Sequence, residues 1–299
     1  MNREILDFLK MNDVDYKEGQ SLAKISPIKI GGVANIVAYP DSEVKLVRLI
    51  AFLEDVKMRH KIVGRMSNIL FSKEGYDGVI IRTDRIDKYR IDGSILTTSG
   101  GVALPFISGI LCRSGLSGFE QISGIPGSIA GAIIGNAGAF DTEISSRLTH
   151  VRYYDYSTDD VTTLDRYEID FSYRSSKFKS IRSAVLSARF SLIPSDTLSV
   201  KTEMDRCRRI RLETQPTEMP SLGSTFKRPA KDIFAAKLID ECGLKGYRIG
   251  GAQISEKHAG FIVNTGGATA KNYIDLSNYA KACVLERFGI YLENEVEIV

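Results

Sequence analysis

The chain has 299 residues, of which 43% are hydrophobic and 26% are charged. These fractions are ordinary for globular proteins and exclude disordered, fibrous and membrane-embedded classes. The 40 basic and 37 acidic residues leave a formal charge of +3, without the concentrated basic stripe of a nucleic-acid-binding protein. The basic stretch Arg206–Arg211 is therefore interpreted as a solvated helix face, and the length predicts two domains.

The N-terminal segment MNREILDFLKMNDVDY mixes acidic and apolar residues and has no signal-peptide core. No later segment is long and apolar enough to span a membrane, so we expect a cytoplasmic protein. The four cysteines form no CxxC pair and have no closely spaced His beside them. We interpret them as free thiols and expect no metal site.

The first half alternates short apolar strands with a helical pattern, at residues 34–39, 44–56, 62–63 and 79–81. This order predicts a β-α-β arrangement. Asp41 or Ser42 is expected to cap the helix, because either side chain can accept a bond from a free N–H group of the first turn.

Residues 100–140 contain a glycine about every four residues, and GIPGSIAGAIIGNAGAF carries almost no charge. Two interpretations stay open: small residues that let helices approach closely, or backbone that must come near a ligand. Glycine turns at 29–32, 64–68 and 124–128 are suited to presenting backbone N–H groups to phosphate. None matches the Walker A or G-x-G-x-x-G pattern, so these turns indicate only a phosphate-binding α+β protein.

The second half predicts two more strands, a boundary, two helices and a final strand. The strands are expected at 149–156 and 183–192, the boundary at 194–196, the helices at 199–213 and 270–287, and the last strand at 290–299. Pro216 and Pro220 must end the first of these helices, and Gly289 is expected to stop the second.

Several blocks together resemble one family: SPIKIGG, GRMSNIL, SGIPGSIAGAIIGNAGAF, YRSSKFK, PSLGSTFKRP, EKHAGFIVNTGGAT and LENEVEIV. They resemble the UDP-N-acetylenolpyruvoylglucosamine reductase (MurB) family from about residue 20 to the C-terminus. The resemblance implies an α+β fold with a vanillyl-alcohol-oxidase (PCMH)-type FAD-binding domain over residues 1–194. That domain would have two α+β subdomains dividing near 84–94, followed by an α+β substrate-binding domain over 195–299.

The activity that the resemblance implies is UDP-N-acetylmuramate dehydrogenase, in peptidoglycan precursor synthesis. NADPH would reduce bound FAD, which would then reduce the enolpyruvyl ether of UDP-N-acetylglucosamine-enolpyruvate. A bound flavin would explain why little nucleophile or metal machinery is visible, because the cofactor carries the redox chemistry. No nucleic-acid, membrane or obligate protein partner is expected.

The resemblance also implies FAD contacts from three turns and two further residues. They are Gly64, Arg65, Met66, Ser67, Asn68 and Ile69; Ser99, Gly100 and Gly101; Gly124, Ile125, Pro126, Gly127 and Ser128; and Asn136 and Gly138. Arg65-Met66 departs from a Gly pair that is frequent in the family.

Three catalytic residues are implied by the same matching: Arg174, Ser224 and Glu295. The planar guanidinium of Arg174 suits a substrate carboxylate and the charge that grows on it. Ser224 would protonate the α-carbon, and Glu295, if protonated, would help to stabilise an enol. Other interpretations stay open: a surface ion pair for Arg174, a helix N-cap or turn hydroxyl for Ser224, and a sheet-edge charge for Glu295.

Substrate contacts are implied for Tyr173, Lys227 and Arg228, with the two basic residues facing the diphosphate. Arg228 departs from the family, in which Asn is common at this position. His258 is interpreted as a hydrogen-bonded turn residue outside the catalytic set. No insertion follows YRSSKFK, so the chain resembles the shorter form of the family, which lacks an extra tyrosine-bearing loop.

Two other functions compete with that of a reductase. A flavin-binding module without activity is disfavoured because Arg174, Ser224 and Glu295 are all present. An alcohol oxidase of the same fold is disfavoured because its chemistry would not use the GSTFKRP block and the C-terminal Glu together.

Overall fold

The computed structural model describes residues 2–299, which group into two compact units. The first unit contains the residues up to Glu18, Ile36–Arg65 and Gly78–Arg209, and the second contains Gly19–Asn35, Met66–Asp77 and Ile210–Val299. The predicted division into domains at residues 194 and 195, and into subdomains near 84–94, stays a prediction.

Two N-terminal helices, α1 (Asn2–Met11) and α2 (Glu43–Asp55), share an apolar core with strands. The sheet has the order β1 (Asp15–Ser21), β2 (Val33–Tyr39), β5 (Tyr76–Arg82) and β3 (His60–Val63). Ser42 is the helix cap, since its Oγ accepts a bond from the Lys45 N–H at 3.3 Å. Asp41 instead pairs with the Lys45 ammonium at 3.0 Å.

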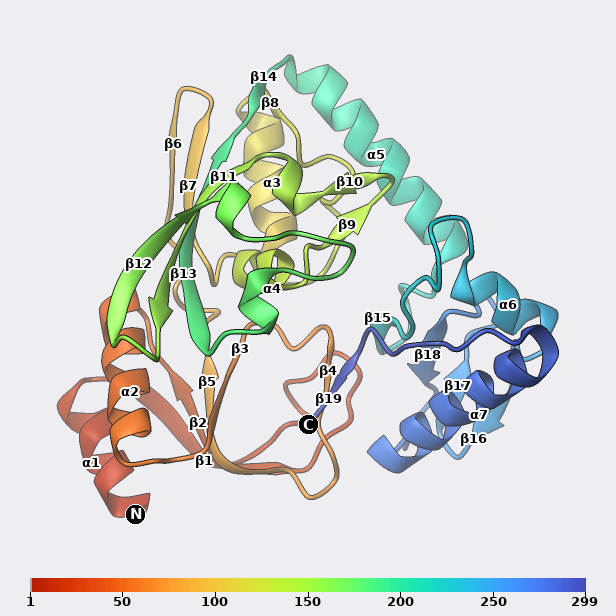
Figure 1. The fold of residues 1–299 in the computed structure, drawn as a ribbon, viewed down its shortest axis with the longest axis horizontal. Helices are drawn as coiled ribbons and strands as arrows, with labels where there is room; N and C mark the ends of the chain where they lie inside the picture. The colour runs from red at the N-terminus through yellow and green to blue at the C-terminus, as the bar shows by residue number, and fades with distance from the viewer. Residues whose placement is uncertain (1) are drawn as a thin grey trace. The chain divides into compact units, whose positions relative to one another are not determined.

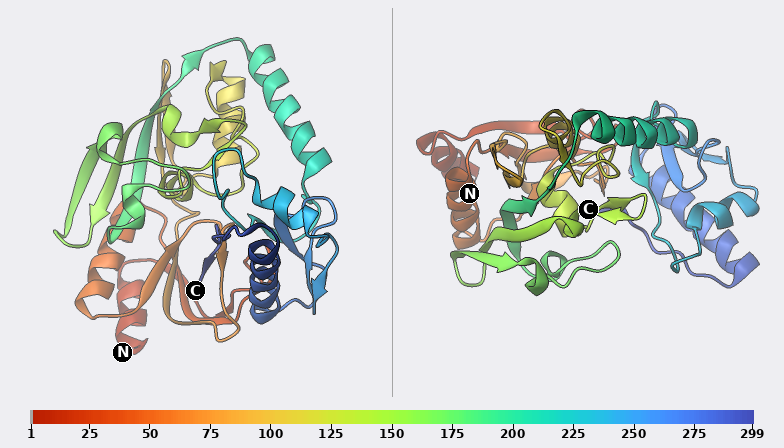
Figure 2. Two further views of the ribbon diagram at one scale, coloured as in Figure 1. Left: turned by 45° about the vertical axis from the view of Figure 1, so that its right-hand side comes forward. Right: turned by 90° about the horizontal axis from the view of Figure 1, so that it is seen from above.

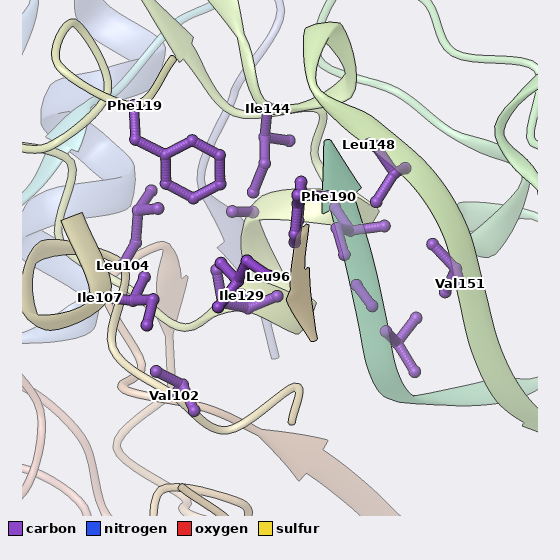
Figure 3. Packing of buried hydrophobic residues seen from close by; sticks show 14 of the residues in the cluster. Leu96, Val102, Leu104, Ile107, Phe119, Ile129, Ile144, Leu148, Val151 and Phe190 are labelled. Carbon is purple, nitrogen blue, oxygen red and sulfur yellow. The ribbon is translucent and has the colours of Figure 1, made fainter. Parts of the chain in front are cut away.

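The larger sheet of the first unit is antiparallel. Its order is β12 (Asp160–Asp165), β11 (Leu148–Asp155), β13 (Ser183–Ser191), β7 (Ile95–Ser99) and β6 (Tyr89–Asp92). Helices α3 (Leu104–Arg113) and α4 (Ile129–Ile134) supply apolar residues to the core on this sheet (Figure 1). Figure 3 shows this core, in which the Phe119 and Phe190 rings meet edge to face at 5.1 Å.

Short elements complete the first unit. They are β8 (Leu116–Ser117) paired with β14 (Ile193–Pro194), β9 (Gly138–Ala139) paired with β10 (Thr142–Glu143), and the 3-10 turns Ile144–Ser146, Arg166–Glu168 and Lys177–Lys179. Helix α5 (Thr197–Thr214) begins in the first unit and ends in the second.

The second unit has a four-stranded antiparallel sheet covered by helices. The strand order is β15 (Ser221–Ser224), β18 (Phe261–Asn264), β17 (Ala252–Ile254) and β16 (Arg248–Ile249), and the helices are α6 (Ala235–Glu241) and α7 (Ala270–Phe288). Helix α7 lies along β16 and β17 (Figure 2). Thr269 and Asn272 form a capping box at its start, and Gly289 ends it with a left-handed φ of 67°, as the sequence predicted.

Most predicted elements are confirmed within one or two residues, but the strand predicted over 290–299 is wrong. Only β19 (Glu297–Ile298) forms there, paired in parallel with β4 (Ile69–Leu70). The chain changes partners along this stretch: the Lys227 N–H donates to the Glu293 carbonyl, whereas the Val299 N–H donates to the Leu70 carbonyl. No single neighbour is available for a continuous ladder.

Two smaller predictions are also confirmed. All four cysteines are free thiols. Arg206, Arg208 and Arg209 are exposed on α5, whereas Arg211 is half-buried, so the solvated face is confirmed for three of the four arginines. Arg206 also pairs with Glu203 at 2.7 Å. Across residues 2–299, no helix combines the length and apolar character needed to cross a membrane.

Candidate active site

Ser224 lies at the end of β15, opposite Phe261 of β18. Gly223 precedes it with φ +78° and the register shifts between Ser221 and Ser224, so the backbone is bent where the hydroxyl is presented. The side chain is exposed. The helix-cap interpretation of Ser224 is wrong, because Phe234 holds that position before α6. A turn hydroxyl stays open.

The Glu295 segment runs antiparallel along the residues that follow Ser224. The Glu295 N–H donates to the Thr225 carbonyl at 2.8 Å, and Phe226 forms an isolated bridge with Asn294. Glu295 itself is half-buried. Ser224 and Glu295 are therefore neighbours through the backbone, although 70 residues of sequence separate them.

Asn68 reaches the same segment from the glycine turn at 64–68. Its Nδ2 donates to the Glu295 carbonyl at 3.0 Å, and its own carbonyl accepts from the Glu297 N–H at 3.0 Å. Both backbone polar groups of Glu295 are thus bonded, the N–H to the Thr225 carbonyl and the carbonyl to the Asn68 amide. Asn68 was expected as an FAD contact, and its bond to Glu295 was not foreseen.

Arg174 lies in the first unit, at a strained turn between Ser172 and Ser175. Its φ is +53°, a conformation that costs a non-glycine residue about 1–3 kcal/mol and tends to occur at functional sites. The guanidinium donates to the Gly138 carbonyl at 3.0 Å and lies 5.0 Å from the centre of the Tyr173 ring. These contacts fix the plane of a half-buried cation.

Asn136, in the glycine-rich block, is hydrogen-bonded to the turn that contains Arg174. Its Nδ2 donates to the Ser172 carbonyl at 3.0 Å and to the Glu143 carboxylate at 2.8 Å. Its Oδ1 is buried, and within residues 2–299 no donor reaches it. A buried acceptor without a donor costs about 1–3 kcal/mol, so a ligand N–H or a water would stabilise this position.

The expected FAD turns of the first unit come together through close backbone contacts. A Cβ on Gly64 would lie 2.4 Å from the Ser128 Oγ, and one on Gly101 would lie 1.8 Å from the Thr83 carbonyl oxygen. The Ala130 N–H donates to the Gly100 carbonyl at 2.8 Å. A side chain at Gly64 would collide with the Ser128 side chain, and one at Gly101 with the Thr83 backbone. These tightly packed glycine turns and the buried Asn136 acceptor fit an FAD site.

Met66 has a left-handed backbone conformation. Its φ is +56°, which glycine adopts without strain and methionine does not. The Met66 side chain is 2% exposed. Its burial offsets part of the backbone cost, because burying a methionine stabilises a fold by about 1.5–3 kcal/mol.

The two basic residues after Ser224 have contacts of their own. The Lys227 ammonium lies 2.9 Å from the Glu293 carboxylate, and this hydrogen bond lowers the pKa of Glu293. The Arg228 guanidinium lies 4.9 Å from the centre of the Phe234 ring. Both residues are half-buried, and their expected contact with a substrate diphosphate stays a prediction.

The expected site residues fall into two groups. Those of the second unit, which include Ser67, Asn68, Ser224, Lys227 and Glu295, come from three segments joined by backbone bonds. Those of the first unit surround the glycine-rich block and the Arg174 turn.

His258 lies in a turn, where its ring bonds to the backbone. The His258 Nδ1 accepts from the Gly260 N–H at 3.2 Å, which agrees with its interpretation as a turn residue. Burial lowers its pKa. In the part of the chain that the structure describes, no group of three His, Cys, Asp or Glu side chains could hold a metal ion.

Comparison with family models gives two matches. Residues 215–299 match the C-terminal domain of UDP-N-acetylenolpyruvoylglucosamine reductase, and residues 34–165 match the FAD binding domain.

Full-length relatives give the same result. The UDP-N-acetylenolpyruvoylglucosamine reductase of Pediococcus pentosaceus is 38% identical, over 96% of this chain and 95% of its own. That of Streptococcus pneumoniae strain JJA is 38% identical over 100% of this chain and 98% of its own. The crystal structure of the Thermus caldophilus reductase superposes with a TM-score of 0.81 at 29% identity, covering 95% of this chain and 98% of that one.

These matches confirm the predicted fold class. The chain combines a PCMH-type, α+β FAD-binding domain with the C-terminal domain of this reductase family.

Proposed function

Because the chain belongs to the UDP-N-acetylenolpyruvoylglucosamine reductase family, we propose that it reduces UDP-N-acetylglucosamine-enolpyruvate to UDP-N-acetylmuramate. NADPH is the proposed source of electrons and FAD the bound carrier. A cytoplasmic location, and action without a nucleic-acid, membrane or obligate protein partner, belong to the same proposal.

FAD, when bound, supplies hydride transfer to the β-carbon of the enolpyruvyl group. Three groups of residues in the first unit would hold it: Gly64 and Arg65; Ser99–Gly101 with Gly124–Ser128; and Asn136 with Gly138. In the second unit, Met66–Ile69 would contribute. The tightly packed glycine turns and the donorless Asn136 oxygen support this assignment.

Arg174 would bind the substrate carboxylate and counter the negative charge that develops at the α-carbon. A planar guanidinium can donate two parallel hydrogen bonds to a carboxylate. The Gly138 carbonyl and the Tyr173 ring restrain the Arg174 side chain. A cation that is already oriented stabilises the transition state without reorganising at the moment of reaction.

Ser224 would donate the proton to the α-carbon, and Glu295, in its protonated form, would donate a hydrogen bond that stabilises the enol. A serine hydroxyl is a very weak acid, so it must lie within reach of a strongly basic carbon. The observation that carries this proposal is the 2.8 Å bond from the Glu295 N–H to the Thr225 carbonyl. It joins the segments of the two residues that the protonation step needs.

Lys227, Arg228 and Tyr173 would complete substrate binding, with the two basic residues on the diphosphate side. Oxidation of an alcohol would not require the segments of Ser224 and Glu295 to be joined. A module without activity has no need of a strained arginine turn at Arg174.

The test is anaerobic reduction of the purified yellow protein with one equivalent of NADPH, followed by the enolpyruvyl UDP-sugar. We expect the flavin absorbance to bleach and then to return, with UDP-N-acetylmuramate as the product. A colourless protein that takes up no FAD, or a reduced flavin that the sugar nucleotide does not reoxidise, would contradict the proposal. An alcohol in place of the sugar nucleotide is the control for the oxidase alternative.

A further inference from the structure

Thr225, the residue between Ser224 and Phe226, is the meeting point of four hydrogen bonds. Its N–H donates to the Gly260 carbonyl at 2.8 Å, and its carbonyl accepts from the Glu295 N–H at 2.8 Å. Its Oγ1 accepts from the Ile262 N–H at 3.2 Å and lies 3.1 Å from the Tyr273 hydroxyl. Every polar group of Thr225 is therefore engaged.

The Thr225 hydroxyl bonds to β18 beyond the point where the backbone pairing of β15 with β18 ends. Strand β15 ends at Ser224 after an irregular register, and the Ile262 N–H of β18 bonds to a side chain instead of a carbonyl. Tyr273, on α7, contacts this hydroxyl from the other side. The pair thus connects the end of β15 with both β18 and α7.

Both side chains are deeply buried. Thr225 is 0% exposed and Tyr273 is 1% exposed, and burial raises the pKa of Tyr273, so the phenol stays neutral. A buried hydroxyl needs a partner. The contact between the two hydroxyls therefore specifies one arrangement of the Thr225 side chain.

The positions of Ser224 and Glu295 depend on this arrangement, because neither residue is held within a regular strand ladder. Ser224 is exposed at a strand end, and Glu295 lies before β19, outside any ladder. Both residues are joined to Thr225. Ser224 precedes it in the chain, and the Glu295 N–H donates to its carbonyl. A shift of the Thr225 peptide would therefore move both residues together.

We propose that Thr225 and Tyr273 form a buried positioning pair that holds Ser224 and Glu295 at the right separation for protonating the substrate carbon. This inference rests on the proposed function, because it assigns the pair to the oxidative half-reaction, in which the enolpyruvyl sugar accepts hydride and a proton. Neither residue touches substrate. Their effect passes through the backbone.

The test compares both half-reactions by rapid mixing in wild type and Tyr273→Phe, well below the melting temperature. Tyr273→Phe removes one oxygen atom and keeps the ring. We expect flavin reduction by NADPH to stay within about twofold, and reoxidation by the enolpyruvyl sugar to slow about tenfold, since sub-ångström misplacement of reacting groups costs rates of this order. Tyr279→Phe is the matched control, because Tyr279 lies on the same helix and is 39% exposed.

Two substitutions at Thr225 sharpen the test. Thr225→Val removes the hydroxyl and with it the contacts to both Tyr273 and Ile262, so it should slow reoxidation at least as much as Tyr273→Phe. Thr225→Ser keeps the hydroxyl and should restore most of the rate. The double variant Thr225→Val/Tyr273→Phe should be no slower than Thr225→Val alone, because Thr225→Val already deletes the contact between the two hydroxyls.

The outcomes separate this inference from the proposed function. If wild type is reoxidised by the sugar but Tyr273→Phe is reoxidised equally fast, or both half-reactions slow equally, the positioning role is overturned and the proposed function stands. If reduced wild type is not reoxidised at all, the proposed function fails and the inference fails with it. Should Thr225→Val not fold, the Tyr273→Phe and Thr225→Ser results decide the question.

Discussion

The Arg174 turn and the Glu295 segment hold their functional side chains by opposite means. Arg174 has a strained left-handed backbone, and its guanidinium is oriented by a carbonyl and a ring. Glu295 lies at a bend, where its N–H donates to the Thr225 carbonyl and its carbonyl accepts from the Asn68 side-chain amide. The first set of contacts orients the side chain itself, and the second holds the backbone that carries the side chain. Substitutions should therefore act directly at Arg174 and at a distance around Glu295.

The largest effect is expected from Arg174→Lys. Lysine keeps the charge but loses the fork that matches a carboxylate and the contact with the Tyr173 ring. Reoxidation of the flavin by the enolpyruvyl sugar should slow between about 100- and 1,000-fold, the range for losing an oriented donor to developing charge. Arg209→Lys, at an exposed position of α5, is the control in the same stopped-flow measurement. A change below threefold would remove Arg174 from the catalytic set.

The next effect concerns Glu295→Gln, which keeps the size and backbone bonds of the residue but removes the acid. We expect the oxidative half-reaction to slow about 100-fold, within the usual contribution of a general acid or base, with NADPH reduction unchanged. Glu297→Gln, two residues along on β19, is the control. Equal rates for the two variants would support the sheet-edge interpretation of Glu295.

A smaller effect is expected from Asn68→Ala, which deletes the amide bond to the Glu295 carbonyl. Loosening one side of the Glu295 peptide should slow reoxidation about tenfold and slow reduction by NADPH less. Asn35→Ala removes a surface amide that bonds to Asp77 at 2.6 Å and serves as the control. If only flavin affinity falls, Asn68 serves the cofactor and does not position Glu295.

The smallest effect is a pH dependence of stability from the Lys227–Glu293 pair. The hydrogen bond from Lys227 lowers the pKa of Glu293, so the stabilisation is fully present above the ordinary glutamate pKa of about 4.3. It is lost as pH falls through the lowered pKa. Lys227→Met should therefore lower Tm slightly at pH 6, and the difference from wild type should shrink as pH falls below 4, in thermal unfolding scans at low salt. A Tm difference that does not change as pH falls would exclude the pair as its cause.

Local patterns allowed much of the fold to be predicted. The apolar stripe of α7 and the stop at Gly289 follow from helical periodicity and the left-handed conformation that glycine tolerates. Helix α3 (Leu104–Arg113) was not predicted, although its buried residues Leu104, Ile107 and Leu111 follow helical spacing. It lies within the glycine-rich residues 100–140, where glycine lowers helix propensity and favours turns. Helix α1 (Asn2–Met11) was not predicted, because its segment is short and mixes acidic, basic and apolar residues.

The sequence predicted which residues form the site, but not the hydrogen bonds that connect them. Family motifs indicated Ser224 and Glu295, but the bond from Asn68 to Glu295 joins residues 227 positions apart, and no local pattern reports such a contact. Tyr273 fits an apolar stripe equally well with or without its hydroxyl. Only its burial beside Thr225 shows that the oxygen needs a partner.

The central claim is that a proton from Ser224 completes the reduction, and single turnover of Ser224→Ala tests it most directly. After anaerobic reduction with NADPH, the variant should bleach at the wild-type rate, and the enolpyruvyl sugar should reoxidise its flavin at least about 100-fold more slowly than in wild type. Ser221→Ala on the same strand should behave as wild type. Reoxidation of Ser224→Ala at the wild-type rate would contradict the account.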